Sequence, residues 1–171
     1  MITSSPRGGD AARDRFPASG REAAARLTGA GYSRTPLARK LGVKPGHRLV
    51  LAAAPPGWTV PELPGDVRPV LLPLPTSDAL PADAATAVDV CVAFCREPVD
   101  VHAAVAAFAE PIRPAGALWI AWPRKAAGHR SDVTENLVRE VALPRGLVDN
   151  KVAALDENWS GLRVVWRREL R

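Results

Sequence analysis

Three apolar segments constrain the fold of this 171-residue chain more than any other feature of its sequence. They cover residues 49–54, 87–95 and 117–122. A strand exposed on one face alternates apolar and polar residues, whereas a strand covered on both faces is apolar throughout, as in parallel sheets. The sequence therefore predicts a largely parallel sheet with both faces covered.

Two helices are predicted near these strands. Residues 35–42 favour a short helix. Thr35 suits its cap, Pro36 its first position and Gly42 its end. Residues 99–112 place four apolar residues on one helical stripe, namely Val101, Val105, Phe108 and Ile112.

The clearest helix signal covers residues 131–146. Asp132 and Glu135 have the N-cap and N3 spacing of a capping box, with Asp in place of Ser or Thr. Pro144 and Gly146 end the pattern. Its apolar stripe consists of Val133, Leu137, Val138 and Val141.

Two further strand signals complete the fold. Residues 67–75 contain three prolines, which cannot donate ladder hydrogen bonds, so we expect a sheet edge there. Residues 150–169 favour two strands around a turn, which is a hairpin. The predicted fold class is α/β, a three-layer Rossmann-like sandwich whose mostly parallel sheet ends in a C-terminal antiparallel hairpin. We expect a single domain over residues 31–171 and a disordered basic tail over residues 1–30.

Positive charge is concentrated in residues 1–48, which hold ten Lys and Arg and three acidic residues, a balance of +7. Residues 49–171 hold thirteen basic and fifteen acidic residues, a balance of −2. A basic arm of this kind can bind nucleic acid. We favour a solvated tail instead, because the arm lacks interleaved aromatic residues and any nucleic-acid motif.

The cysteines and the apolar segments indicate a cytoplasmic protein. Cys91 and Cys95 are predicted on one strand, about 13 Å apart, which is too far for a disulfide. We expect two buried thiols in a reducing compartment. No metal site is predicted, because the three histidines show no ligand spacing. We expect no membrane segment, because no apolar run approaches the roughly 20 residues that a spanning helix needs, and the N-terminus shows no secretory signal.

From Val43 onward, the order of the segments resembles the class I S-adenosylmethionine-dependent methyltransferase fold in a shortened form. The resemblance implies a cofactor held at a glycine-rich turn after the first strand, and an acidic residue that ends the second strand. Here the turn reads "AAAPPGW", where two prolines lack N–H groups and Trp58 occupies space. Only Asp78 follows the second strand, beyond two prolines. We therefore predict no cofactor, and S-adenosylmethionine is disfavoured.

Five segments resemble an uncharacterised bacterial family of unknown function, of the DUF3052 kind, which is common in actinobacteria. They cover most of residues 31–167. The resemblance implies a small cytoplasmic domain and no activity that can be transferred to this chain. The five segments are "GYSRTPLARKLGVKPG", "GALWIAWPRKAAG", "SDVTENLVREVAL", "GLVDNKV" and "LDENWSGLRVV".

Ligands of open parallel sheets bind beyond the carboxyl ends of the strands, which here combine aromatic, basic and acidic residues. Each residue also has a structural interpretation: tryptophans can cover the core, Asp132 can cap a helix, Asp156 can accept hydrogen bonds in a turn, and Arg124 and Lys125 can pair with Asp156 and Glu157. His129 could act as an acid or base, or lie in solvent. The candidate ligand- or partner-binding residues are Gly57, Trp58, Trp122, Arg124, Lys125, Asp132, Asp156, Glu157 and Trp159.

Three functions are compatible with these observations. The first is a non-catalytic small-molecule- or protein-binding or regulatory module on a degenerate methyltransferase-like fold. The second is a divergent S-adenosylmethionine-dependent methyltransferase or another small-molecule transferase. The third is nucleic-acid binding through the basic arm. We favour the first, because the fold is predicted without its usual cofactor turn, and we predict no catalytic residues.

Overall fold

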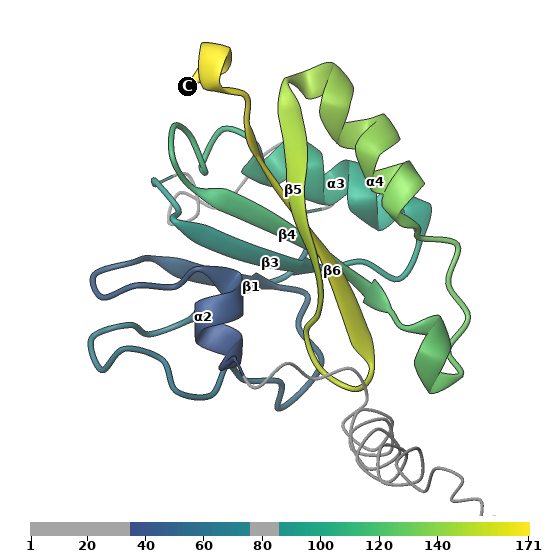
Figure 1. The fold of residues 1–171 in the computed structure, drawn as a ribbon, viewed down its shortest axis with the longest axis horizontal. Helices are drawn as coiled ribbons and strands as arrows, with labels where there is room; N and C mark the ends of the chain where they lie inside the picture. Colours follow the sequence, from purple (N-terminus) through teal and green to yellow (C-terminus); the bar gives the residue numbers. More distant parts are fainter. Residues whose placement is uncertain (1–34, 76–85) are drawn as a thin grey trace, which may run out of the picture. The chain divides into compact units, whose positions relative to one another are not determined.

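The computed structural model describes residues 35–75 and 86–171, which form one six-stranded sheet with helices on both faces (Figure 1). The predicted N-terminal tail and Asp78 lie outside the described residues. The strands are β1 (Leu49–Ala52), β2 (Val70–Leu72), β3 (Val90–Phe94), β4 (Ala117–Pro123), β5 (Leu147–Ala154) and β6 (Trp159–Trp166). The helices are α2 (Leu37–Leu41), α3 (Pro98–Phe108) and α4 (Glu135–Ala142), with 3-10 turns η1 (Lys125–Ala127), η2 (Leu143–Arg145) and η3 (Arg168–Leu170).

The strands follow the order β2-β1-β3-β4-β6-β5 across the sheet. β1 pairs in parallel with β2 and β3, and β3 pairs in parallel with β4. β6 lies antiparallel between β4 and β5. This topology confirms the predicted α/β fold class, a mostly parallel Rossmann-like sandwich with a closing antiparallel hairpin.

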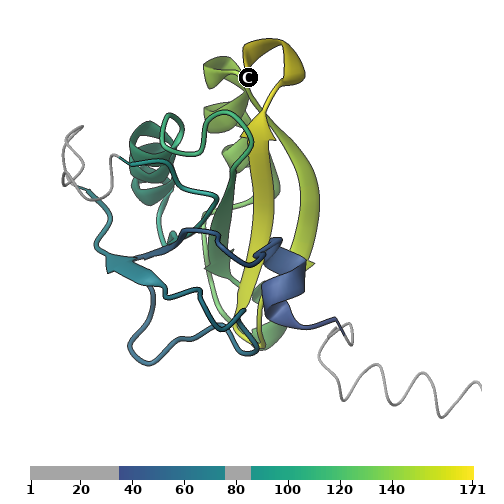
Figure 2. The ribbon, with the colours of Figure 1, turned by 90° about the vertical axis from the view of Figure 1, so that its left-hand side faces the viewer.

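The sheet separates two apolar cores, one on each face. Helix α2 lies on one face, and α3 and α4 lie on the other (Figures 1 and 2). In β3, Cys91 and Ala93 join the core under α3 and α4, whereas Val92 and Phe94 join the core on the face of α2. All residues of β1 and β3 are buried, which confirms that these apolar segments are strands covered on both faces. The α2 face is completed by the non-helical segment 53–69, whose Val60 and Val67 are buried in the same core.

The predicted stripe of the second helix is confirmed, because its four residues are all fully buried. The helix itself is shorter than predicted, since α3 ends at Phe108 and the chain then turns. Ile112 lies beyond the end of α3 and is still buried in the core. Its N–H donates to the Phe108 carbonyl at 3.3 Å, a bond of the helical i to i−4 kind.

The predicted caps of two helices are wrong. α4 is capped by Thr134, whose hydroxyl accepts a hydrogen bond from the Leu137 N–H at 3.2 Å, so Asp132 lies outside the helix. With the cap at 134, Glu135 becomes the first helical residue and its carboxylate pairs with Arg139 at 3.0 Å. α2 begins one residue later than predicted, because Pro36 has extended backbone with a ψ of 144°. The predicted end at Gly42 is confirmed, with a φ of +85° that favours glycine.

β2 lies at the edge of the sheet, as its prolines predicted. The backbone of Leu72 points toward β1, because its carbonyl accepts a hydrogen bond from the Ala53 N–H at 2.7 Å. Neighbouring strand residues face opposite ways, so the N–H and C=O of Leu71 face away from β1, as do the flanking positions Pro69 and Pro73. Prolines at two of the three outward positions leave a single N–H there, which protects the edge from pairing with another strand.

The starts of β3 and β4 pack closely at Gly116. A Cβ added there would lie 2.4 Å from the Val88 carbonyl oxygen and 2.7 Å from that of Ile112, whereas a Cβ at Gly65 would meet nothing within 4 Å. We expect Gly116→Ala to lower the free energy of unfolding by about 2 kcal/mol or more, measured by urea denaturation. Gly65→Ala is the control and should change it by less than about 0.5 kcal/mol. Equal effects would show that the backbone relaxes around Gly116.

Candidate functional site

Three aromatic rings meet where β1 and β3 end and β6 begins. Phe94 is the last residue of β3, Trp159 is the first of β6, and Trp58 comes from the loop after β1. The ring centroids of Trp58 and Phe94 lie 4.7 Å apart with planes at 70°, and those of Phe94 and Trp159 lie 4.9 Å apart at 86°. Both contacts are edge-to-face, a favoured geometry for aromatic pairs. On the α2 face, the carboxyl edge of the sheet is therefore covered by the protein's own aromatic side chains.

The loop that brings Trp58 to this edge is a tight turn. The Trp58 N–H donates to the Pro55 carbonyl at 3.0 Å, and Gly57 has a φ of +75°. Pro56 followed by a glycine with positive φ is the pattern of a type II turn. Pro55 and Pro56 have no N–H, and those of Ala53 and Trp58 are already bonded to carbonyls. Few backbone donors of this turn are left for a phosphate or a cofactor.

Asp156 fixes the Trp58 ring from the loop between β5 and β6. Its Oδ2 accepts a hydrogen bond from Trp58 Nε1 at 2.8 Å. Its Oδ1 accepts the backbone N–H groups of Asn158 at 2.7 Å and Trp159 at 2.8 Å. The carboxylate therefore joins two segments that are 98 residues apart in the chain. This arrangement confirms the structural interpretation of Asp156 as an acceptor of N–H groups in the hairpin turn.

Arg124 and Glu157 lie beside this contact. Arg124 Nη1 lies 3.2 Å from the Asp156 carbonyl oxygen and 3.5 Å from that of Glu157, and its backbone N–H donates to the Asn158 carbonyl at 2.8 Å. The guanidinium thus supports the backbone of the hairpin loop. The Glu157 side chain is exposed at the end of that loop.

The other predicted site residues lie elsewhere. Trp122 packs in the core under α3 and α4, on the opposite face of the sheet from Trp159. Lys125 is exposed in η1, and Asp132 is exposed before α4. His129 lies near the hairpin loop, where its Nε2 is 2.9 Å from Asn158 Oδ1. The structure thus brings together Gly57, Trp58, Arg124, Asp156, Glu157 and Trp159, and separates Trp122, Lys125 and Asp132 from them.

Two aromatic contacts at this edge were not predicted from the sequence. Phe94 links the two tryptophans, and the Arg96 guanidinium carbon lies 5.1 Å from the centroid of the Trp159 ring. Phe94 ends β3 and Arg96 lies two residues beyond it, so the carboxyl-end rule could have included them. Their role at this edge depends on the face of the sheet to which Phe94 points. The uninterrupted apolar segment 87–95 does not indicate which face that is.

A groove beside Trp58 was also not predicted from the sequence. It has a volume of about 410 Å³ and lies between the segment 53–69 and the edge strand β2. Its walls are mainly apolar, and Leu71, 68% exposed, lies on the β2 side. The lining of the groove includes Leu51, Trp58, Val60, Leu63, Arg68 and Leu71.

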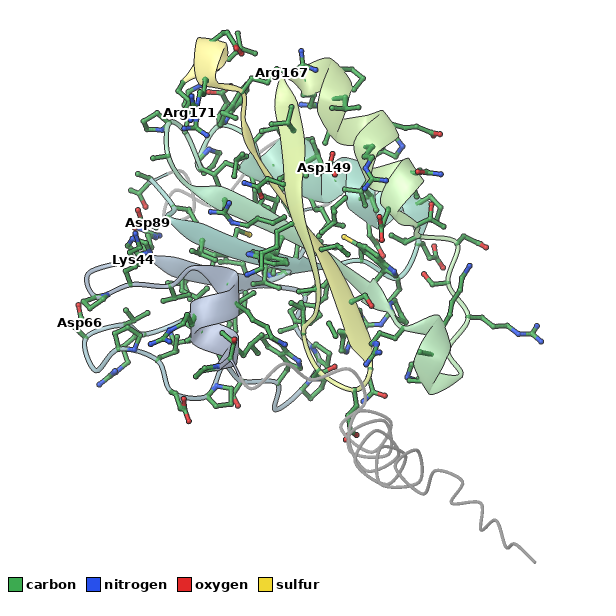
Figure 3. All side chains as sticks on the ribbon, viewed as in Figure 1. Lys44, Asp66, Asp89, Asp149, Arg167 and Arg171 are labelled. Atoms are coloured by element: carbon green, nitrogen blue, oxygen red, sulfur yellow. The ribbon has the colours of Figure 1, made fainter. Side chains whose placement is uncertain are left out.

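The segment 53–69 that shapes this groove is tied to its surroundings at both ends. Asp66 accepts a hydrogen bond from the Gly46 N–H through Oδ2, in the turn before β1, and Figure 3 shows Asp66 at the loop tip near Lys44. Trp58 is tied to Asp156, as described above. The wall of the groove that this segment forms is therefore held in place without a helix.

A basic cluster joins α2 to the hairpin. Lys40 Nζ donates to the Ala154 carbonyl at 3.2 Å, and Lys151 Nζ donates to the Lys40 carbonyl at 3.0 Å. Trp119 Nε1 donates to the Leu41 carbonyl at 3.1 Å. Burial lowers the pKa of Lys40, and the charges of Lys151 and Arg124 lower it further. Cations and N–H donors at the C-terminal end of a helix are stabilising, so this cluster has a structural role in docking α2.

The described residues show neither a metal cluster nor a membrane helix. Within residues 35–75 and 86–171, no three His, Cys, Asp or Glu side chains gather in a way that could hold a metal ion. No helix among those residues is long and apolar enough to cross a membrane. Cys91 and Cys95 are both buried free thiols in the core under α3 and α4, and burial raises the pKa of each.

Comparison with known proteins places the chain in a family. Residues 63–168 match the family described as "Protein of unknown function (DUF3052)". The chain belongs to this family. No curated protein matches the chain. Among solved structures, it is similar to the Methanococcus jannaschii fibrillarin pre-rRNA processing protein, with a TM-score of 0.49 and 14% identity over 85% of this chain and 74% of that one.

The bond between Trp58 and Asp156 can be tested by a double-mutant cycle. Asp156→Asn replaces an acceptor with an amide donor opposite Trp58 Nε1, and Trp58→Phe removes the indole donor. Each should lower the free energy of unfolding by about 1–3 kcal/mol, because a partly buried polar group loses its partner. The coupling energy from urea denaturation should be at least about 1 kcal/mol.

The matched control for this cycle is Glu157→Gln, which changes an exposed carboxylate of the same loop. It should alter stability by less than about 0.5 kcal/mol. Additive effects of the two site substitutions would contradict the proposed connection between the turn after β1 and the hairpin.

Proposed function

We propose that this member of the DUF3052 family is a non-catalytic binding module that uses the groove beside Trp58. The observation that supports this best is the position of Trp58 itself. Its indole N–H is bonded to Asp156 and its ring contacts Phe94, so it fills the carboxyl edge while it lines the groove. The place where related folds accept a cofactor is occupied, and a separate apolar surface lies next to it.

The groove has the features of a small-ligand site. Its volume of about 410 Å³ is within the range of roughly 300–1,000 Å³ that is typical of ligand pockets. Apolar walls supply affinity through burial, and Leu71 is a large side chain that gains burial only when something covers it. Because Trp58 and Asp66 fix the segment 53–69, little ordering is needed on binding, which favours affinity.

The alternative of a divergent methyltransferase requires the edge to open. S-adenosylmethionine would have to displace Trp58 from Phe94 and from Asp156, or bind in a different place. The prolines at 55 and 56 would still offer no N–H to it. These losses favour a binding module over a transferase.

A thermal-shift screen tests the proposal. The panel contains S-adenosylmethionine, S-adenosylhomocysteine, nucleotides, dinucleotides and small apolar compounds. We expect stabilisation by at least one apolar compound and none by S-adenosylmethionine. A ligand at one hundred times its Kd stabilises a fold by about 2.7 kcal/mol, which raises Tm by several degrees. The shift should disappear in Leu71→Ser, because a polar hydroxymethyl group replaces the exposed apolar wall.

Val152→Ser is the matched control, since Val152 is 53% exposed on β5 at the opposite edge of the sheet. The apolar compound should stabilise this variant as it does the unmodified protein. A saturable shift with S-adenosylmethionine that is lost in Asp156→Asn or Trp58→Ala would instead support the transferase alternative and contradict the binding module.

A further inference from the structure

The lining of the groove indicates the chemistry of its ligand. We infer that the groove binds a small carboxylic acid with an apolar body, and that Arg68 at the rim binds the carboxylate. This inference rests on the proposed function, because it assigns a ligand class to the same groove.

The composition of the groove lining indicates an apolar ligand with one negative group. Among the described residues that line the groove, Arg68 is the one that carries a charge. Leu51, Val60, Leu63 and Leu71 supply aliphatic surface, and Trp58 adds an aromatic wall. A ligand that matches this lining has an apolar body and one negative group, because a second charge would meet apolar walls and lose its hydration without a partner.

Backbone contacts orient the Arg68 guanidinium. Its Nη1 donates to the carbonyl oxygens of Gly65 at 2.8 Å and Val67 at 3.2 Å. Within residues 35–75 and 86–171, no ion pair joins Arg68 to an acidic side chain. The guanidinium is therefore held over the turn at 65–67, and no carboxylate among the described residues compensates its charge. Arginine presents several N–H donors in a planar fork, so a carboxylate can bind the group while the contacts to the turn remain.

The edge of β2 favours a small molecule over a peptide. A peptide that added a strand to this edge would gain its affinity from main-chain hydrogen bonds to β2. Pro69 and Pro73 remove the N–H groups at two of the three outward positions there, and Leu71 alone retains one. Because an added strand would find few hydrogen-bond partners at this edge, a ligand would bind through side-chain contacts in the groove and through the charge of Arg68. These interactions suit a compact ligand.

Isothermal titration calorimetry with a pair of probes tests the inference. 2-Naphthoate and 2-naphthamide share one ring system and differ in charge. The full chain should bind naphthoate roughly three- to tenfold more tightly than naphthamide, the range for a charged hydrogen bond at a partly exposed site. Raising the salt concentration should reduce this preference, because an exposed ionic contact is screened.

Variants separate the charge from the apolar walls. Arg68→Gln keeps a donor for the carbonyls of the turn and should remove the preference for naphthoate while naphthamide binds within about twofold of its original affinity. Leu71→Ser should weaken both probes by a similar factor. Val152→Ser, at the other edge of the sheet, should change neither.

Different results would overturn different parts of the inference. Equal binding of both probes, each weakened by Leu71→Ser, would refute the carboxylate and leave the proposed binding groove intact. Binding of neither probe at millimolar concentration would refute the small apolar ligand and count against the groove itself. Tighter binding of an acetylated hydrophobic hexapeptide than of naphthoate would overturn the small-molecule class in favour of a protein partner.

Discussion

The central strands β1 and β3 are buried on both faces, so each face of the sheet must be covered. On one face the helices α3 and α4 provide the cover with apolar stripes, and their backbone groups bond within the helices. On the other face α2 has only five residues. The remaining surface is covered by a segment without a helix, and this requirement explains most of the unusual contacts in the molecule.

A segment without a helix or strand needs other partners for its backbone and a fixed path over the core. Here the path is fixed by the turn at Pro55–Trp58, by the hydrogen bond from Gly46, in the turn before β1, to Asp66, and by Asp156 in the hairpin. The groove follows from the same solution. A helix would lie flat on the sheet, whereas a segment held at separate points leaves a space between itself and the edge strand β2.

The strands and the layers could be predicted from the sequence because burial on both faces leaves uninterrupted apolar segments. The gathering of Trp58, Asp156 and Trp159 could also be predicted, since all three follow or precede strands at one edge. The position of Trp122 on the opposite face of the sheet could not be predicted. It lies opposite Ser160 in the antiparallel pairing of β4 with β6, and only that register decides that it faces away from Trp159.

Local competition explains the errors at the helix ends, and orientation explains the missed groove. Asp132 and Thr134 are both good caps, and the burial of Val133 between them is decided by tertiary packing. Arg68 and Leu71 read as ordinary residues of a proline-rich edge. Their meeting in one groove depends on which way β2 faces, which follows from its hydrogen bond to Ala53.

The position of β6 between β4 and β5 sets an order on the assembly of the sheet. During synthesis, β5 leaves the ribosome before β6, yet its partner in the sheet is β6. Until β6 is made, β5 has no place to pair, and β4 keeps an open apolar edge that other chains could join. The nascent sheet therefore stays open at β4 until β6 is made, and in that interval the stretch from β4 to β6 is exposed to pairing with other chains.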